Sequence, residues 1–271
     1  MNVKPFIWLL VPLTNNALAQ DYNLGVRAHA MGGSGVAFAT DPEGQFINPA
    51  ALAQVPHKAV TLSYSHPFGI KEIALASVAV GAAFNQMTLG LAVTHLGLAQ
   101  FEDQTFAFTG ALKFSMSSRK KETRALLLGV QSVFRRVQIA RYEGRMNWRM
   151  HVGLIAPVSE AIAWGAALGN VLEAGREKSA RAIALGMSYR SPARFIGQFD
   201  IFKQTDFPLE LRAGGEMLLF APLTLRVGMS TNPERFTVGL AFHFRPATLH
   251  VTTFSHIDLG WTQQYAATIW D

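Results

Sequence analysis

The clearest pattern in the chain is a strict alternation of large apolar side chains with small or polar ones between residues 235 and 245. Neighbouring side chains of a β-strand point to opposite faces, so a period of two predicts a strand with two chemically different faces. The residues of the large apolar face are Phe236, Val238, Leu240, Phe242 and Phe244. The residues of the opposite face are Thr237, Gly239, Ala241, His243 and Arg245.

The same alternation recurs through residues 57–271, for example over 87–94, 105–115, 182–190 and 223–230. Large apolar faces suit contact with lipid and small or polar faces suit a lumen, so the pattern predicts a transmembrane antiparallel β-barrel. The alternative is a soluble β-sandwich, which would bury the large side chains and expose the charged ones. We favour the barrel, because a sandwich would have to achieve this with very short turns.

Turn-forming residues divide this region at thirteen places, which predicts about fourteen strands. Proline cannot donate a hydrogen bond to a strand ladder, so Pro67, Pro192, Pro222 and Pro233 mark breaks between strands. An even number of strands places both ends of a barrel on one side of the membrane. Around residues 134–139 the alternation changes parity, which indicates either a β-bulge or a strand that extends beyond the bilayer.

The first nineteen residues have the pattern of a secretory signal peptide. Lys4 supplies a positive charge, residues 6–13 form an apolar run, and Ala17-Leu18-Ala19 forms a small-x-small cleavage site. We therefore expect cleavage before Gln20.

Residues 20–56 differ from both the signal peptide and the strands, because they are rich in glycine and alanine and carry few charges. A segment of such small residues cannot fill a core of its own. We therefore expect it to form a compact plug in the lumen of the barrel that residues 57–271 build.

Composition narrows the class of protein further. Hydrophobic residues make up 49% of the chain and charged residues 15%, against about 25% charged in a typical soluble protein. The chain has no cysteine, which excludes a disulfide scaffold, thiolate metal ligands and a cysteine nucleophile. The net charge is +6, but the basic residues are scattered rather than clustered. Anionic lipid head groups account for this charge better than nucleic acid does.

No sequence motif for catalysis or cofactor binding stands out. The glycine-rich stretch 32–35 lacks the preceding strand and following helix that a phosphate-binding loop requires. Ser255, His256 and Asp258 are close in sequence, but such neighbours are poorly placed to converge as a catalytic triad. His243 and His250 would face each other across a two-residue turn, without a visible third metal ligand. We predict no enzyme activity, no cofactor and no metal site.

Charged residues on the predicted lumen face form one candidate site late in the chain. If the turn at Ala221-Pro222 has three residues, Glu216 lies directly opposite Arg226 on the lumen face, and a longer turn leaves the two as diagonal neighbours. These charges either form structural ion pairs or hold the plug or a ligand head group. We hypothesise that three of them, Arg212, Glu216 and Arg226, bind the plug backbone near Asn48. The whole predicted cluster comprises Glu210, Arg212, Glu216, Arg226 and Arg245.

The plug segment also carries a motif that resembles a known family. FadL-like and PorV/PorQ-like outer-membrane proteins begin with G-x-R-A-x-x-M-G-G-A-x-V-A, an acidic residue and then N-P-A-x-L. The principal matching residues here are Gly25, Arg27, Met31, Gly32, Gly33, Asp41, Asn48 and Pro49. The PorV/PorQ branch is also similar at residues 164–170, 211–216, 225–228 and 259–262.

This resemblance implies a fourteen-stranded barrel with an N-terminal hatch in the outer membrane of a Gram-negative-type bacterium. Some members of the family move hydrophobic small molecules, and others are accessory subunits of type IX secretion. The predicted outer loops are short, whereas fatty-acid transporters capture ligands with long ones. We therefore favour an accessory or scaffold component in secretion or envelope assembly, with secretion or envelope proteins as partners. The alternative is a passive transporter of small hydrophobic molecules. Outer-membrane lipids are expected partners in both cases, and nucleic acid is not.

Overall fold

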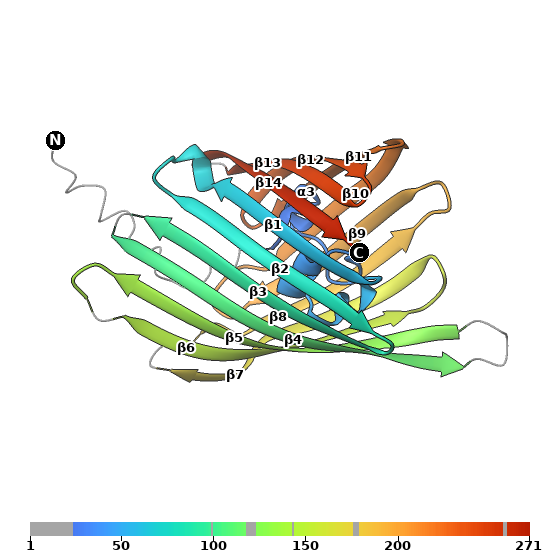
Figure 1. Cartoon of the computed structure of the whole chain (residues 1–271), viewed down its shortest axis with the longest axis horizontal. Helices are drawn as coiled ribbons and strands as arrows, with labels where there is room; N and C mark the ends of the chain where they lie inside the picture. The colour runs from blue at the N-terminus through green and yellow to red at the C-terminus, as the bar shows by residue number, and fades with distance from the viewer. Residues whose placement is uncertain (1–23, 99, 118–122, 143, 176–178, 257–258) are drawn as a thin grey trace.

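Fourteen antiparallel strands close into a barrel, as the sequence predicts (Figure 1). This computed structural model describes residues 24–271 except 99, 118–122, 143, 176–178 and 257–258. Each strand pairs with its neighbours in sequence, and β1 pairs with β14 to complete the barrel. The predicted signal peptide lies outside the described residues. Within the described part of the chain, no helix has the length and apolar character needed to cross a membrane.

The strand boundaries follow the turn residues closely. The first seven strands are β1 (Lys58–His66), β2 (Ala74–Phe84), β3 (Met87–Leu98), β4 (Phe101–Ser117), β5 (Thr123–Ile139), β6 (Arg145–Pro157) and β7 (Ile162–Gly175). The other seven are β8 (Ala182–Arg190), β9 (Phe195–Gln204), β10 (Glu210–Phe220), β11 (Leu223–Thr231), β12 (Glu234–Phe244), β13 (Ala247–His256) and β14 (Gly260–Trp270). A short 3₁₀ helix, η4 (Pro67–Gly69), follows β1.

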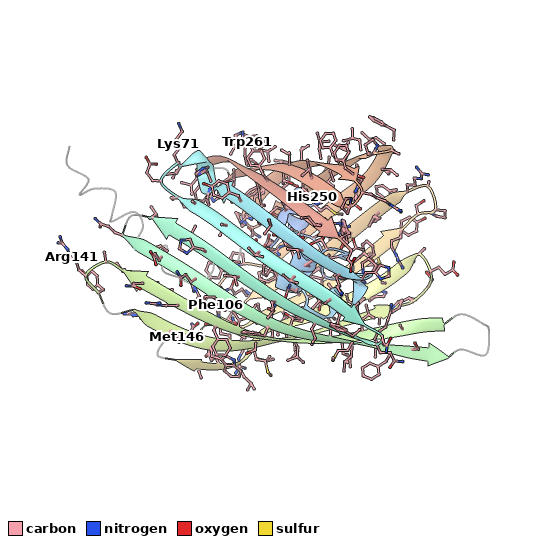
Figure 2. The ribbon with its side chains drawn as sticks, in the orientation of Figure 1. Lys71, Phe106, Arg141, Met146, His250 and Trp261 are labelled. Atoms are coloured by element: carbon pink, nitrogen blue, oxygen red, sulfur yellow. The ribbon has the colours of Figure 1, made fainter. Side chains whose placement is uncertain are left out.

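The two faces of the wall have the predicted chemistry. Large apolar side chains point outward, and Figure 2 labels Phe106, Met146 and Trp261 among the exposed ones. The lumen face instead carries small or polar side chains such as Thr61 and Ala111, which are fully buried. A soluble sandwich would show the opposite arrangement, so the barrel is the correct interpretation of the alternation.

The strands differ in length around the barrel. β4 and β5 each contain 17 residues, and they project beyond the shorter strands in Figure 1. A tilted strand needs only about 9–11 residues to cross a bilayer. Residues 134–139 of β5 pair with β4 without any register shift. The change in the alternation at residues 134–139 is therefore explained by a strand that extends beyond the bilayer, and not by a bulge.

Residues 24–56, here called the N-terminal segment, lie inside the barrel (Figure 1). They form one short α-helix, α3 (Val26–Ala30), and two 3₁₀ helices, η2 (Pro42–Phe46) and η3 (Pro49–Gln54). Asn48 caps η3 by accepting a hydrogen bond from the Ala50 N–H, and Pro49 occupies the first helical position, where its missing N–H costs nothing. Alanines of η3 pack with Leu52 against the wall and form part of the largest apolar cluster.

Candidate functional site

The wall of the barrel carries glycines where the N-terminal segment approaches most closely. A side chain at Gly153 of β6 would collide with Oδ1 of Asn48, and one at Gly129 of β5 would collide with the backbone of Pro49 and Ala50. At Gly228 of β11, an added Cβ would meet the backbone of residues 31 and 32. These glycines let two backbones come into direct contact, which fixes the position of the N-terminal segment.

Asn48 joins the N-terminal segment to itself and to the wall. Its Nδ2 donates to the carbonyl oxygen of Val36 at 2.7 Å and lies 3.2 Å and 3.4 Å from those of Leu154 and Ala166. The side chain is fully buried. A longer or apolar residue at this position could not satisfy these carbonyl groups, which explains why an asparagine precedes Pro49.

Two buried carboxylates hold backbone N–H groups of the N-terminal segment. Asp200 of β9 accepts from Gly35 at 2.7 Å and from Val36 at 3.0 Å. Within the segment, Glu43 accepts from Val26 at 2.8 Å and from the Ser77 hydroxyl at 3.0 Å. Burial raises the pKa of Glu43 to about 7, and the nearby negative charge of Asp41 adds to the rise. This carboxyl group therefore takes up a proton close to neutral pH.

A buried ion-pair cluster connects α3 with the wall. Oε2 of Glu216 lies 3.0 Å from Nε of Arg27 and 2.6 Å from Nε of Arg226. Glu216 and Arg226 stand directly opposite each other on β10 and β11, the closer of the two registers that the sequence allows. Arg226 also lies 2.9 Å from Nδ1 of His250. One carboxylate thus compensates two guanidinium groups, one on the N-terminal segment and one on the wall.

The predicted lumen cluster needs two corrections. Arg212 pairs with Glu210 at 2.7 Å and approaches the carbonyl oxygen of Gly33 at 3.4 Å. The charges therefore meet the N-terminal segment at Arg27 and Gly33, and not near Asn48 as hypothesised. Arg245 does not belong to the cluster, since it is exposed in the turn after the last β12–β13 pair, Phe244 with Ala247. The alternation continues into this turn, but the strand does not.

The motif residues of the N-terminal segment are all buried in the lumen. Met31 and Gly32 face the glycines of β10 and β11, and Gly33 packs against the Arg212 side chain. Gly25 precedes α3 with a positive φ of 86°, and a Cβ there would collide with Glu43. Asp41 is 6% exposed, and its Oδ2 has no hydrogen-bond partner among the described residues.

The two histidines proposed as neighbours are not paired. His243 stands opposite Thr248, and His250 stands opposite Ala241, because the turn falls one residue earlier than expected. Within the described ranges, no group of three or more histidine or acidic side chains could hold a metal ion. The Oγ of Ser255 accepts a hydrogen bond from the Phe236 N–H. Asp258 lies outside the described residues.

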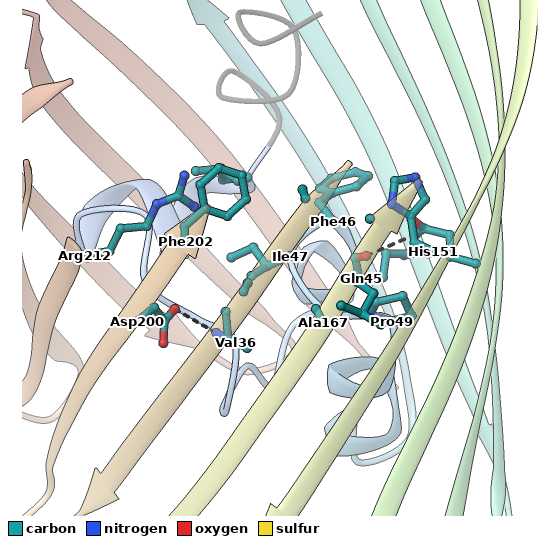
Figure 3. A pocket seen from close by; sticks show the side chains of 16 residues that line it. Val36, Gln45, Phe46, Ile47, Pro49, His151, Ala167, Asp200, Phe202 and Arg212 are labelled. Carbon is teal, nitrogen blue, oxygen red and sulfur yellow. Dashed lines mark hydrogen bonds between the residues drawn. The ribbon is translucent and has the colours of Figure 1, made fainter. Parts of the chain in front are cut away.

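A pocket lies between the N-terminal segment and the wall formed by β5–β10, and its cavity is about 50 Å³. Figure 3 shows Arg212 and Phe202 on one side and His151 on the other, with Phe46 and Ile47 between them. The Arg212 guanidinium stacks over the Phe202 ring at 4.3 Å. The lining combines apolar side chains such as Phe46 and Ile47 with the polar groups of Gln45, Gln131, His151, Asp200 and Arg212.

Sequence reasoning missed the residues that form this pocket. The period-two alternation along each strand could have assigned His151, Asp200 and Phe202 to the lumen face. Nothing in a single strand indicates, however, that strands β6 and β9 face the same part of the N-terminal segment.

The barrel is similar in fold to several solved structures. The CymD monoaromatic hydrocarbon channel has a TM-score of 0.63 at 12% identity, covering 91% of this chain and 96% of its own. The toluene transporter TbuX of Ralstonia pickettii has a TM-score of 0.60 at 13% identity, covering 92% and 98%. A FadL homologue of Pseudomonas aeruginosa has a TM-score of 0.60 at 11% identity, covering 90% and 98%.

No protein-family model and no curated protein sequence matches the chain. The similarity to known proteins is therefore one of structure. It tests the two resemblances that the motif in the N-terminal segment indicates. The FadL-like resemblance holds at the level of fold, whereas none of these neighbours supports the PorV/PorQ branch. The neighbours are named as channels and transporters, not as enzymes. The chain therefore has the fold of FadL-type outer-membrane channels.

Proposed function

We propose that this protein is a passive channel for small hydrophobic molecules in the outer membrane, with the N-terminal segment as its plug. The observation that carries this proposal is the partly apolar pocket between the segment and the wall. The solved structures with the same fold include channels named for monoaromatic hydrocarbons and toluene. This proposal replaces the secretion role as the preferred function.

One edge of the pocket lies at the end of the β7–β8 ladder, where we place the route of an apolar ligand. The β7–β8 ladder ends at the pair Gly169 and Ala182, and both residues line the pocket. Leu168 also lines the pocket, yet it is 40% exposed on the outer, lipid-facing side. Gly169 has no side chain, and that of Ala182 is small. A ligand could therefore pass between lumen and lipid here.

The pocket is too small for an aromatic ring in this arrangement of side chains. A cavity of about 150 Å³ holds a benzene molecule, and the pocket is much smaller at about 50 Å³. Phe46 and Ile47 are only partly buried, and they project from the N-terminal segment into the pocket. A ring can enter only if these side chains, or the segment that carries them, move aside.

We expect Ala184→Phe to reduce uptake of toluene by liposomes that contain the protein. Ala184 lies on the lumen face of β8 and lines the pocket, so a phenyl ring there occupies the space of the ligand. The matched control is Leu185→Phe, which places the same ring on the lipid face. Uptake that is equal in both variants and the wild type would contradict a route through this pocket.

A second candidate is an accessory or scaffold role in secretion or envelope assembly. It is favoured by the PorV/PorQ-like residues and by the short connections between strands. Even the connection between β1 and β2 has only the seven residues 67–73. Purification from native membranes with chemical cross-linking tests it. Recovery of secretion-system subunits would support the scaffold, and recovery of the barrel alone would leave the channel as the better account.

A further inference from the structure

Strands β4 and β5 continue together beyond the end of the wall that their neighbours form. At this end of the barrel, the outermost pair of β4 with β3 is Leu112 with Met87, and that of β5 with β6 is Leu127 with Ile155. Residues 114–117 of β4 and 123–126 of β5, here called the hairpin arm, pair only with each other among the described strands. The arm projects past the other strands at the lower right of Figure 1.

The β4 side of the hairpin arm is an open strand edge. The N–H of Lys113 donates to the carbonyl oxygen of Gln86 at 2.7 Å, just before β3 begins. In an antiparallel ladder, the backbone groups of alternate residues point to the same side. The N–H and C=O of Ser115 therefore point away from β5, to a side where no strand of the described chain supplies a partner.

Lipid cannot cover this edge. Unpaired backbone groups that face lipid do not occur within the hydrocarbon region of a bilayer, so the arm must extend into the water beside the membrane. Its outward face is nevertheless apolar, since the Phe114 side chain is 47% exposed. An open strand edge beside an exposed aromatic side chain is typical of a site that pairs with an added strand.

The charge of the hairpin arm restricts the kind of strand that can be added. Lys113, at the base of the arm, is exposed. The sequence of residues 113–126 contains five basic residues and one acidic residue, a net charge of +4. Residues 118–122 lie outside the described part of the chain, and only their charge is considered. Like charges would repel a second copy of this arm, whereas an acidic segment is attracted.

We propose that the β4 edge of the hairpin arm binds an extended, acidic segment of another protein, which adds to the sheet as a further strand. Backbone groups of the segment bond to those of Ser115. Because neighbouring side chains of a strand point to opposite faces, the segment should alternate apolar residues beside Phe114 with acidic residues beside Lys113. This interaction goes beyond the proposed channel and does not depend on it.

The side of the membrane follows from the connections at this end of the barrel. The β2–β3 connection consists of residues 85–86, and the β10–β11 connection consists of residues 221–222. Connections this short are typical of the periplasmic side of outer-membrane barrels. In the outer membrane, the partner is therefore a periplasmic protein.

The test uses two synthetic peptides, one of alternating glutamate and valine and one of alternating lysine and valine. Fluorescence anisotropy measures the binding of each peptide to the full chain in lipid nanodiscs. We expect the glutamate peptide to bind and the lysine peptide not to bind. Ser115→Pro removes the edge N–H but no bond of the β4–β5 ladder, so it should weaken binding of the glutamate peptide roughly tenfold or more. Lys113→Glu should weaken it as well, through repulsion.

The matched control is Ser115→Ala, which keeps the edge N–H and should bind the glutamate peptide as the wild type does. Heat-dependent mobility in gels verifies that each variant forms the barrel. Equal affinity of the glutamate peptide for the wild type and Ser115→Pro overturns the proposal, as does equal affinity of the two peptides for the wild type. A dimer of the barrel that Ser115→Pro dissociates also overturns it, because a second copy would then occupy the edge.

A second measurement tests whether the hairpin arm lies in water. Phe108 and Phe114 are on the same outward face of β4, and both are exposed. In vesicles of brominated phospholipid, the fluorescence that Phe108→Trp adds to the wild type should be quenched, and the fluorescence that Phe114→Trp adds should be quenched much less. Equal quenching would place the arm in lipid and overturn the proposal.

Discussion

Replacing Glu216 with alanine is expected to loosen α3 from the wall and to raise the conductance of the barrel in planar bilayers. The Glu216 carboxylate compensates Arg27 on the N-terminal segment and Arg226 on β11, and both arginines are buried. Without it, two like charges remain close together with no counter-charge between them. Removing one partner of a buried ion pair costs about 3–5 kcal/mol, and we expect this cost to fall on the contact between segment and wall.

The control for this experiment is Glu234→Ala, which removes an exposed carboxylate at the start of β12. Conductance that stays at the wild-type level in Glu216→Ala would show that the cluster does not hold the segment. A triple variant, Arg27→Met with Glu216→Leu and Arg226→Met, separates the ion pairs from their packing. Because apolar residues of similar volume often replace buried ion pairs without loss, the triple variant should conduct less than Glu216→Ala.

Replacing Gly153 with valine is expected to displace Asn48 and η3 from their seat on β6. Even a Cβ at position 153 would collide with Oδ1 of Asn48. The Asn48 side chain is held in place by its hydrogen bonds to three carbonyl groups. Overpacking typically costs about 1–3 kcal/mol, and a rigid neighbour places this variant at the upper end. The N-terminal segment should become sensitive to added protease, and the conductance should rise.

Gly110→Val is the matched control, because a Cβ at Gly110 of β4 meets nothing within 4 Å. Proteolysis of the N-terminal segment is followed by mass spectrometry in both variants, with the barrel intact in gels. Equal protection of the segment in Gly153→Val and Gly110→Val would mean that the wall glycine does not determine the seat. The two predictions act at opposite ends of the N-terminal segment, so each can hold or fail independently.

The sequence alone determined the barrel, because its signal is local and repeated. Alternation sets which face of each strand is apolar, and turn residues such as Pro222 and Pro233 set where strands end. The register between β10 and β11 could also be predicted from the sequence, since a short turn leaves few ways to pair Glu216 with Arg226. In the β12–β13 hairpin, the predicted turn was one residue too late. This error misplaced His243, His250 and Arg245, because it shifts every pair in the hairpin.

Tertiary structure decided how the N-terminal segment meets the wall. Arg27 and Glu216 are 189 residues apart, and only closure of the barrel brings them within 3.0 Å. The positions of Asn48 and of the pocket beside Phe202 likewise depend on several strands at once. Side-chain periodicity is a property of one strand, whereas a lumen site depends on the tilt, register and closure of all fourteen. The sequence therefore determined the wall and its two faces, and the closed barrel determined which residues of the lumen act together.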